Sequence, residues 1–342
     1  MINTLRKILF KLSVKTPTRL TLNTNNLYKK YYRSNTGQYS FGEKNHNKIF
    51  YVIKRTPGTG FFSNVLFVIN HLMIAKKNNY IPIVDMENFP TIYNEINEIF
   101  KIKNSWEYYF ENFDNTKLTE VYQSKNVIIT SNKFETHFEL DLISNEIKEV
   151  FRKNLKLKKR YIRFVDYFSN KYFKNKKVLG VHFRGTSYKR SAGHPFPATK
   201  KQMLNIIEQL LKYEKYEKIF LVTEEENYKN FLIKKFKDKI IYIHSSFRSN
   251  SNNAFKIYPR KNHRYKLGRE ALIESSLLSK CDGLVYVTSN IASAAIAWNL
   301  NKSQKKFKID NGINSKNLIL SNFLWFIRGM LPRLLGGFKK TL

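Results

Sequence analysis

Short apolar runs alternate with helix-length segments throughout the second half of this 342-residue chain, and this alternation restricts its fold more than any other feature. Strands are predicted at Val178–Phe183, Lys218–Thr223, Ile240–Ile243 and Gly283–Val287. Helices are predicted between them, at Thr199–Tyr213, Tyr228–Phe236 and Arg269–Lys280. Strands and helices that alternate in this way form a parallel sheet covered by helices on both faces. The sequence therefore predicts an α/β fold.

The first half of the chain shows the same order once. A strand at Ile49–Ile53, the turn Pro57-Gly58-Thr59-Gly60, a helix at Ser63–Lys77 and a strand at Ile81–Val84 follow one another. This order is half of a nucleotide-binding fold, in which helix amides face the crevice at the strand ends. The glycines of the turn serve either a steric need or a phosphate, and Asn64 either caps the helix or touches a ligand.

We divide the chain into four parts at changes in composition. Residues 1–45 are expected to form a basic arm, with a short helix at Leu5–Leu12 followed by a polar loop up to Asn47. Residues 46–174 are expected to form a first Rossmann-like domain that ends in a helical stretch at Ser144–Lys174. Residues 175–320 are expected to form a second Rossmann-like domain, and residues 321–342 a basic amphipathic segment. An aromatic cluster at Trp106–Phe110 either lines a sugar groove or packs in the core.

The charge of the chain indicates an anionic partner. Its 61 Lys and Arg against 26 Asp and Glu give a formal net charge of +35. Nucleotide, anionic lipid and acidic glycan all fit this charge, whereas no recognisable nucleic-acid module is present. The single cysteine, Cys281, excludes an intramolecular disulfide and a zinc site of clustered thiolates, which fits a reducing cytosol. No secretory signal or membrane span is recognised, so a cytoplasmic location is expected.

Both ends of the chain carry apolar residues among basic ones. Leu5, Ile8, Leu9 and Leu12 lie among Arg6, Lys7 and Lys11, and Phe323, Ile327 and Met330 lie near Arg328. Such segments either pack on their own protein or lie on an anionic membrane surface. In the second case the protein would be peripheral on the inner face of the membrane and its acceptor would be lipid-linked.

Polar residues follow three of the predicted strands in the second half. They are His182 and Arg184, Thr223 and Glu224, and the run Thr288-Ser289-Asn290. In open parallel sheets, ligands bind beyond the carboxyl ends of the strands. A pyrophosphate there would meet Arg184, the Ser289 hydroxyl and the amides that open the helix after Asn290. The alternative is an ordinary buried strand whose arginine pairs with a surface carboxylate.

A guanine base would need a carboxylate to accept its N1–H and amino group, and Glu274 can supply one. No Asp-x-Asp pair occurs in the chain, so we expect no metal at the diphosphate and assign stabilisation of the leaving charge to Arg184 and helix dipoles. For the catalytic base the candidates are His194, in Gly193-His194-Pro195, and Glu224, although His194 is equally readable as a loop histidine and Glu224 as a donor-binding residue.

Three segments resemble the donor-site motifs of the α1,6-, α1,2- and protein O-fucosyltransferase superfamily. They are His182-x-Arg184-x-Thr186, Leu278-Ser279-Lys280-Cys281-Asp282-x-Leu284-Val285 and Thr288-Ser289-Asn290. The nearest relatives by this resemblance are core α1,6-fucosyltransferases and nodulation fucosyltransferases. The resemblance implies the GT-B glycosyltransferase fold, in which two Rossmann-like domains with parallel sheets face a cleft. Residues 46–174 would then be the acceptor-side domain and residues 175–320 the nucleotide-sugar donor domain.

The resemblance also implies an activity and roles for residues. Fucose would move from GDP-fucose to a glycan or glycolipid-linked acceptor, as in polysaccharide biosynthesis, with inversion and without metal. Arg184 would hold the β-phosphate, His182 would contact the nucleotide, Glu274 would bind guanine, and Ser289, with Asn290 at the same turn, would meet the diphosphate.

Two positions depart from the pattern of the relatives. These most often read His-x-Arg-Arg-Thr-Asp, whereas this chain has Gly185 at the second arginine and Ser187 at the aspartate. The loss of an arginine weakens phosphate binding, and the loss of the acid leaves the base unassigned. The rival functions are transfer from another nucleotide-activated sugar and, in a different class, basic nucleic-acid binding.

Overall fold

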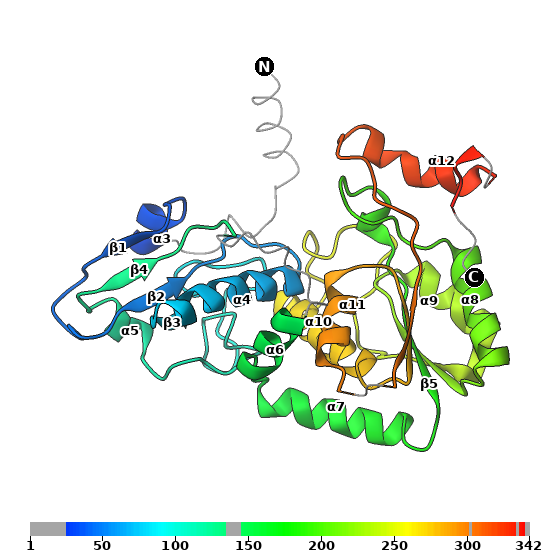
Figure 1. Cartoon of the computed structure of the whole chain (residues 1–342), viewed down its shortest axis with the longest axis horizontal. Coiled ribbons are helices and arrows are strands. Elements are labelled where there is room, and N and C mark those ends of the chain that lie inside the picture. The colour runs from blue at the N-terminus through cyan, green and yellow to red at the C-terminus, as the bar shows by residue number, and fades with distance from the viewer. Residues whose placement is uncertain (1–24, 135–144, 301–302, 333–334, 339–342) are drawn as a thin grey trace. The chain divides into compact units, whose positions relative to one another are not determined.

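The computed structural model describes residues 25–134, 145–300, 303–332 and 335–338 (Figure 1). The predicted helix at Leu5–Leu12 lies outside these residues. The described residues divide into two compact units: residues up to 134 with Asn253–Gly268 form the first, and residues 145–252 with those from Arg269 onward form the second. No helix in the described ranges is long and apolar enough to cross a membrane.

A five-stranded, fully parallel sheet forms the centre of the second unit, in the order β7-β6-β5-β8-β9. Its strands are β5 (Val178–His182), β6 (Lys218–Val222), β7 (Ile240–Ile241), β8 (Gly283–Tyr286) and β9 (Lys305–Lys308). The α/β prediction for this half is confirmed. The sequence analysis missed β9, because its lysine-rich run lacks the apolar signal of a strand.

Helices cover both faces of this sheet. The second unit contains α6 (Asn145–Asn154), α7 (Lys159–Tyr172), η1 (Thr186–Lys189), α8 (Lys200–Tyr213), α9 (Glu226–Phe236), η2 (Lys237–Lys239), α11 (Asn290–Trp298), η3 (Leu320–Asn322) and α12 (Leu324–Met330). Helix α10 (His263–Leu278) begins in the first unit and ends in the second.

Alternate residues of the strands select the two faces, because successive side chains point to opposite sides. Leu179 and Val181 pack in one core cluster with Met203 of α8 and Leu232 of α9. On the opposite face the ring of Phe220 lies 5.3–5.8 Å from those of Phe168 and Phe173, at α7. The central strands are buried on both faces, as a parallel sheet requires.

Helices α6 and α7 pack on the second unit, although the sequence analysis assigned their residues to the first domain. Arg152 of α6 donates hydrogen bonds to the carbonyl oxygens of Ala297 and Asn299, at 2.5 and 2.6 Å. These carbonyls lie at the end of α11, where a helix leaves its last acceptors unpaired. The ring of Phe151 packs 4.8 Å from that of Trp298. The change in composition predicted a domain boundary at residue 174, but these packing contacts place residues 145–174 in the second unit.

A four-stranded sheet forms the centre of the first unit, in the order β1-β4-β2-β3. Its strands are β1 (Gly37–Tyr39), β2 (Phe50–Ile53), β3 (Ile81–Val84) and β4 (Val127–Ile129), and its helices are α3 (Asn26–Tyr31), α4 (Phe61–Lys77) and α5 (Leu118–Val121). Strands β2, β3 and β4 are parallel, and β1 pairs with β4 in the antiparallel direction.

The predicted loop up to Asn47 is wrong, because this segment contains α3 and β1. The buried Lys54, directly after β2, helps to hold it in place. The Lys54 ammonium donates to the carbonyl oxygen of Tyr31 and, at 3.0 Å, to the Ser34 hydroxyl. Burial lowers the pKa of Lys54 to about 8. The polar composition of the segment hid these contacts, which come from a residue distant in sequence.

The turn before α4 shows what its first glycine does. Gly58 has a φ of +74°, which L side chains rarely adopt. A Cβ there would lie 2.7 Å from Asn64 Oδ1, and this oxygen accepts the amide of Thr59 at 2.9 Å. Asn64 thus braces the turn, and the steric role fits Gly58.

Replacement of Phe151 by alanine tests the docking of α6 on the second unit. The side chain is fully buried against Trp298, so Phe151→Ala should lower the free energy of unfolding by about 3–5 kcal/mol in urea titrations followed by circular dichroism. The exposed neighbour Lys153 provides the control, since Lys153→Ala should change it by less than about 0.5 kcal/mol. Equal stability of the two variants would contradict this packing.

Candidate functional site

The carboxyl ends of β5, β6 and β8 bring polar side chains together at one edge of the second sheet. His182 pairs in register with Val222 of β6 and Tyr286 of β8, so the three strands end level with one another. The chain runs from β5 outward to β6 and β7 on one side and to β8 and β9 on the other. The crevice between β5 and β8 is therefore the topological switch point, where open α/β sheets bind ligands.

His182 and Ser289 meet across this switch point. The Ser289 hydroxyl lies 3.2 Å from His182 Nδ1 and caps α11 by accepting the amide of Ala292. A hydroxyl oxygen has two lone pairs, so Ser289 can accept from the Ala292 amide and still either donate to or accept from Nδ1. Burial lowers the pKa of His182 to about 4, with Glu224 raising and Arg184 lowering it. The imidazole ring is thus neutral near pH 7 and lies at the start of α11.

Arg184 is held by Glu224 from the neighbouring strand. Its Nη1 lies 3.2 Å from Glu224 Oε1, and its Nη2 donates to Ser187 Oγ at 3.3 Å. The same carboxylate oxygen accepts the amide of Gly185 at 2.9 Å and the hydroxyl of Thr186 at 3.0 Å. Burial raises the pKa of Glu224, but Arg184 and the Gly185 amide outweigh it, so the net shift is downward. Glu224 is therefore a fixed anion that orients Arg184.

Gly185 occurs where the relatives carry a second arginine, and the structure supplies a reason. A Cβ at this position would lie 2.1 Å from Glu225 Oε2. That oxygen accepts the Thr186 amide at 2.9 Å and pairs with the Lys189 ammonium at 2.8 Å. Both side chains of the pair are largely buried. The Lys189–Glu225 pair thus takes the space beside the loop that a side chain at residue 185 would need.

His194 packs against Tyr188, and Tyr188 in turn lies against Arg184. The Arg184 guanidinium lies 4.5 Å from the centre of the Tyr188 ring, and the His194 ring packs edge-on against it at 5.3 Å. His194 is exposed, and its Nδ1 lies 3.0 Å from the carbonyl oxygen of Ala192. Because a carbonyl can only accept, Nδ1 carries the proton and Nε2 keeps a free lone pair. His194 thus has the tautomer of a general base.

Glu274 of α10 lies with Arg248, a residue that the sequence analysis missed. Arg248 Nη2 and Glu274 Oε1 are 3.8 Å apart, too far for a hydrogen bond, and neither atom has a hydrogen-bond partner among the described residues. Both side chains are almost fully buried. Burial raises the pKa of Glu274 to about 7, against the lowering effect of Arg248. Buried polar atoms left unpaired in this way indicate a ligand or water position.

A signal for Arg248 was present in the sequence. The residue follows the predicted strand Ile240–Ile243 by five positions, so it lies beyond a strand end as Arg184 does. The sequence analysis considered only three of the strand ends.

Two predicted site residues remain. Thr223 has a local structural role, and the structure shows no role for Asn290. The hydroxyl of Thr223 is buried and accepts the amide of Glu225 at 3.2 Å. Asn290 is the exposed first residue of α11.

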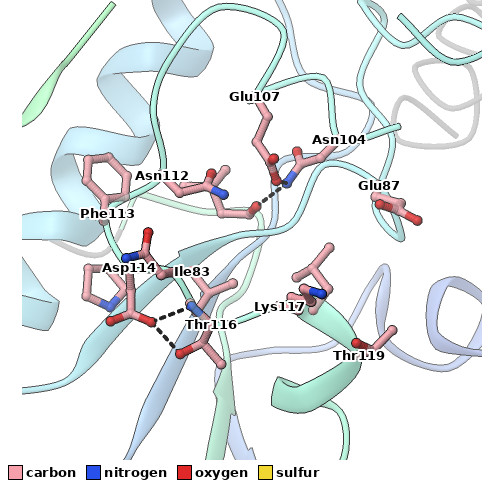
Figure 2. Close-up of a pocket in the computed structure, with 14 residues that line it drawn as sticks. Ile83, Glu87, Asn104, Glu107, Asn112, Phe113, Asp114, Thr116, Lys117 and Thr119 are labelled. Atoms are coloured by element: carbon pink, nitrogen blue, oxygen red, sulfur yellow. Dashed lines mark hydrogen bonds between the residues drawn. The ribbon is translucent and has the colours of Figure 1, made fainter. Parts of the chain in front are cut away.

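A pocket of about 290 Å³ lies in the first unit, lined by residues of β3 and of the segment 104–119 (Figure 2). Figure 2 shows Glu107 hydrogen-bonded to Asn104 on one wall, and Asp114 bonded to Thr116 on another. Three carboxylates, those of Glu87, Glu107 and Asp114, line the pocket together with one ammonium, that of Lys117. This charge disfavours a diphosphate in this pocket.

The aromatic cluster beside this pocket belongs to the core. Trp106, Tyr108, Tyr109 and Phe110 are each at most 2% exposed, and of the run only Glu107 lines the pocket. The core interpretation is confirmed for the aromatic residues.

Comparison with known proteins gives likeness in structure only. No protein-family model and no curated protein matches the sequence. The fucosyltransferase NodZ from Bradyrhizobium is 16% identical, with 72% of this chain and 92% of that chain covered and a TM-score of 0.48. A mutant of Arabidopsis thaliana FUT1 in complex with GDP is 10% identical, with 78% and 72% covered and a TM-score of 0.44. POFUT1 in complex with GDP is 11% identical, with 75% and 72% covered and a TM-score of 0.35.

Restoring each motif departure separately tests the account of Gly185. Gly185→Arg should lower the free energy of unfolding by about 1–3 kcal/mol, because the new side chain must displace Glu225. Ser187→Asp is the matched control; residue 187 is only partly buried and an aspartate can still accept from Arg184, so stability should change by less than about 0.5 kcal/mol. Thermal unfolding measures both. A stable Gly185→Arg variant would contradict the steric account.

The raised pKa of Glu274 predicts a pH dependence of stability. The folded carboxyl binds its proton more tightly than the unfolded one, so its contribution is full below pH 4.5 and is lost as the pH rises through about 7. Between pH 4.5 and about 7, the free energy of unfolding of the wild type should fall by up to about 3 kcal/mol relative to that of Glu274→Gln. Urea unfolding of both proteins measures this difference. A difference that stays constant with pH would rule out this titration.

Proposed function

We propose that this protein is a GT-B glycosyltransferase that moves fucose from GDP-fucose to a glycan hydroxyl, with inversion and without metal. The observation that carries the proposal is the arrangement at the switch point of the second sheet. There Arg184 follows β5 and is held by Glu224, and Ser289 follows β8 and caps the start of α11. Glu274, on α10, is a buried carboxylate with one oxygen that lacks a hydrogen-bond partner among the described residues.

Arg184 suits the diphosphate of such a donor. A guanidinium has five N–H donors, and Glu224 and Ser187 take only part of this capacity. The side chain is 23% exposed, so phosphate oxygens can reach it. Ser289 and the amides at the start of α11 add donors and a favourable dipole on the other side. Together they stabilise the charge of departing GDP.

Glu274 and Arg248 suit a guanine base. The N1–H and amino group of guanine form a pair of donors that one carboxylate can accept, while the O6 and N7 acceptors match an arginine. Pairing with these donors would satisfy the open Glu274 oxygen and favour its ionised form. Uracil and cytosine lack this combination of groups, so the site would discriminate between nucleotides by leaving buried polar atoms unpaired.

His194 is the better candidate for the base. Its Nε2 lone pair is free and exposed, whereas Glu224 is neutralised by Arg184 and by two other donors. In the proposed step, Nε2 removes the proton of the acceptor hydroxyl as its oxygen attacks the anomeric carbon of fucose. The bond from that carbon to the β-phosphate oxygen breaks, and the electron pair leaves with GDP beside Arg184.

Two variants should separate donor binding from proton removal. Turnover is scored as nucleotide released from a panel of nucleotide sugars, with and without glycan acceptors, and GDP-fucose should be the best donor. Arg184→Ala should weaken GDP binding in calorimetry and lower kcat/KM by about 10²–10³-fold. His194→Gln should lower kcat by about 10²–10⁴-fold and leave the Kd for GDP unchanged.

The exposed Arg163 of α7 provides a control of equal charge change, and Arg163→Ala should behave as the wild type. Release of UDP or CMP in preference to GDP would contradict GDP-fucose as the donor, but it would still support transferase activity. Binding of none of the three nucleotides would overturn the proposal.

A further inference from the structure

Exposed apolar side chains are concentrated near the end of the chain. Of the nineteen large apolar side chains that are exposed in the described residues, ten lie between Ile313 and Leu335. These 23 positions are a small part of the chain, and scattered exposure would not gather there. A contiguous exposed apolar surface of this kind marks an interaction site.

The outward stripe of this segment has helical spacing. Ile319, Phe323, Ile327 and Met330 follow one another at intervals of four, four and three residues, across η3 and α12. Their exposed fractions are 73%, 60%, 45% and 79%. Phe323, Ile327 and Met330 have the spacing of one face of α12, and Ile319 precedes them across the turn η3; we call these four exposed side chains the outer stripe. Figure 1 shows α12 at the border of the second unit.

The opposite side of α12 is already anchored on the second unit. Trp325 Nε1 donates to the carbonyl oxygen of Pro197 at 3.0 Å, and the Arg328 guanidinium lies 5.1 Å from the centre of the Phe196 ring. The sequence predicted either packing of this segment on the core or contact with lipid. In the structure one side of the segment packs on the core, and its outer stripe stays exposed. The orientation of the helix is fixed by these contacts.

The charge around the outer stripe selects its partner. From residue 311 to the end, the sequence holds no Asp or Glu, and Lys316 and Arg328 lie within the described part of the segment. The adjoining loop adds Arg190, whose guanidinium lies over Phe326 at 5.4 Å. An apolar strip flanked by Lys316, Arg328 and Arg190 matches an anionic bilayer surface. A second copy of a chain with net charge +35 would bring like charges together.

We propose that the outer stripe docks this protein on an anionic lipid bilayer. Phe323, Ile327 and Met330 enter the boundary between head groups and acyl chains, and the basic side chains contact lipid phosphates. Docking of this kind is peripheral and reversible, and it weakens with salt because part of it is electrostatic.

The stripe also lies next to the loop that carries His194. The amide of Asn314 donates to the carbonyl oxygen of His194 at 2.8 Å, and the amide of Gly193 donates to that of Ser315 at 3.1 Å. The segment that leads to the stripe is thus joined to the loop of the proposed base. The acceptor is then a lipid-linked glycan, an inference that rests on the proposed function, whereas the docking itself does not.

Vesicle sedimentation of the full-length chain, with no nucleotide sugar present, tests the docking. The wild type should pellet with vesicles that contain about one-third phosphatidylglycerol, should bind neutral phosphatidylcholine at least about 10-fold more weakly, and should be released by salt. The triple variant Phe323→Ser, Ile327→Ser, Met330→Ser should bind anionic vesicles at least about 10-fold more weakly than the wild type.

The control is a triple variant at exposed apolar residues elsewhere in the second unit, Ile162→Ser, Tyr167→Ser and Tyr213→Ser, which should bind as the wild type. Circular dichroism checks that both variants remain folded. Equal binding by both triple variants, or no binding by the wild type, overturns the docking. So does a wild type that ignores vesicles but forms a dimer that the first triple variant loses in sedimentation velocity. Failure of transferase activity alone leaves the vesicle result untouched and counts against the proposed function.

Discussion

The carboxylate of Glu224 holds the ends of β5 and β6 together, and the rest of the site depends on it. One of its oxygens lies within hydrogen-bond distance of Arg184, the Gly185 amide and the Thr186 hydroxyl. A partly buried anion with three donors costs less than an unpaired one, so these contacts favour one conformation of the loop after β5. That conformation fixes Arg184 at the carboxyl ends of β5 and β6. The same loop carries Tyr188 and His194 into place beside it.

The molecule uses its few acids where they have a structural or chemical effect. In a chain with 26 Asp and Glu against 61 Lys and Arg, Glu224 and Glu225 both fix the loop after β5, and Glu274 is buried beside Arg248. Glu274 has a buried oxygen with no hydrogen-bond partner among the described residues, and burial raises its pKa. This difference in environment separates two roles for glutamate at one sheet edge: one orients a cation, and the other is open to a ligand.

Local pattern sufficed to predict the fold, whereas contacts between distant residues were beyond it. The strands at 178–182 and 283–286 and the polar residues after them follow from apolar runs and turns. Strand β9 was missed because Lys305–Lys308 has no apolar run, and α3 because it is held by Lys54 and the core around Tyr31. The sequence suggested, as one alternative, that Arg184 pairs with a surface carboxylate, but it did not identify Glu224 as that partner. The fit of Gly185 against Glu225 and the open atoms of Arg248 need coordinates, since they depend on distances of a few ångströms.

The central claim is that the strand-end site of the second unit binds a guanine nucleotide diphosphate, and a crystal structure with GDP tests it most directly. The account predicts phosphate oxygens within about 3 Å of Arg184 and Ser289, with the guanine edge at the same distance from the Glu274 carboxylate. A nucleotide seated in the carboxylate-lined pocket of the first unit, or a diphosphate at the second unit that leaves Arg184 and Glu274 untouched, would contradict it.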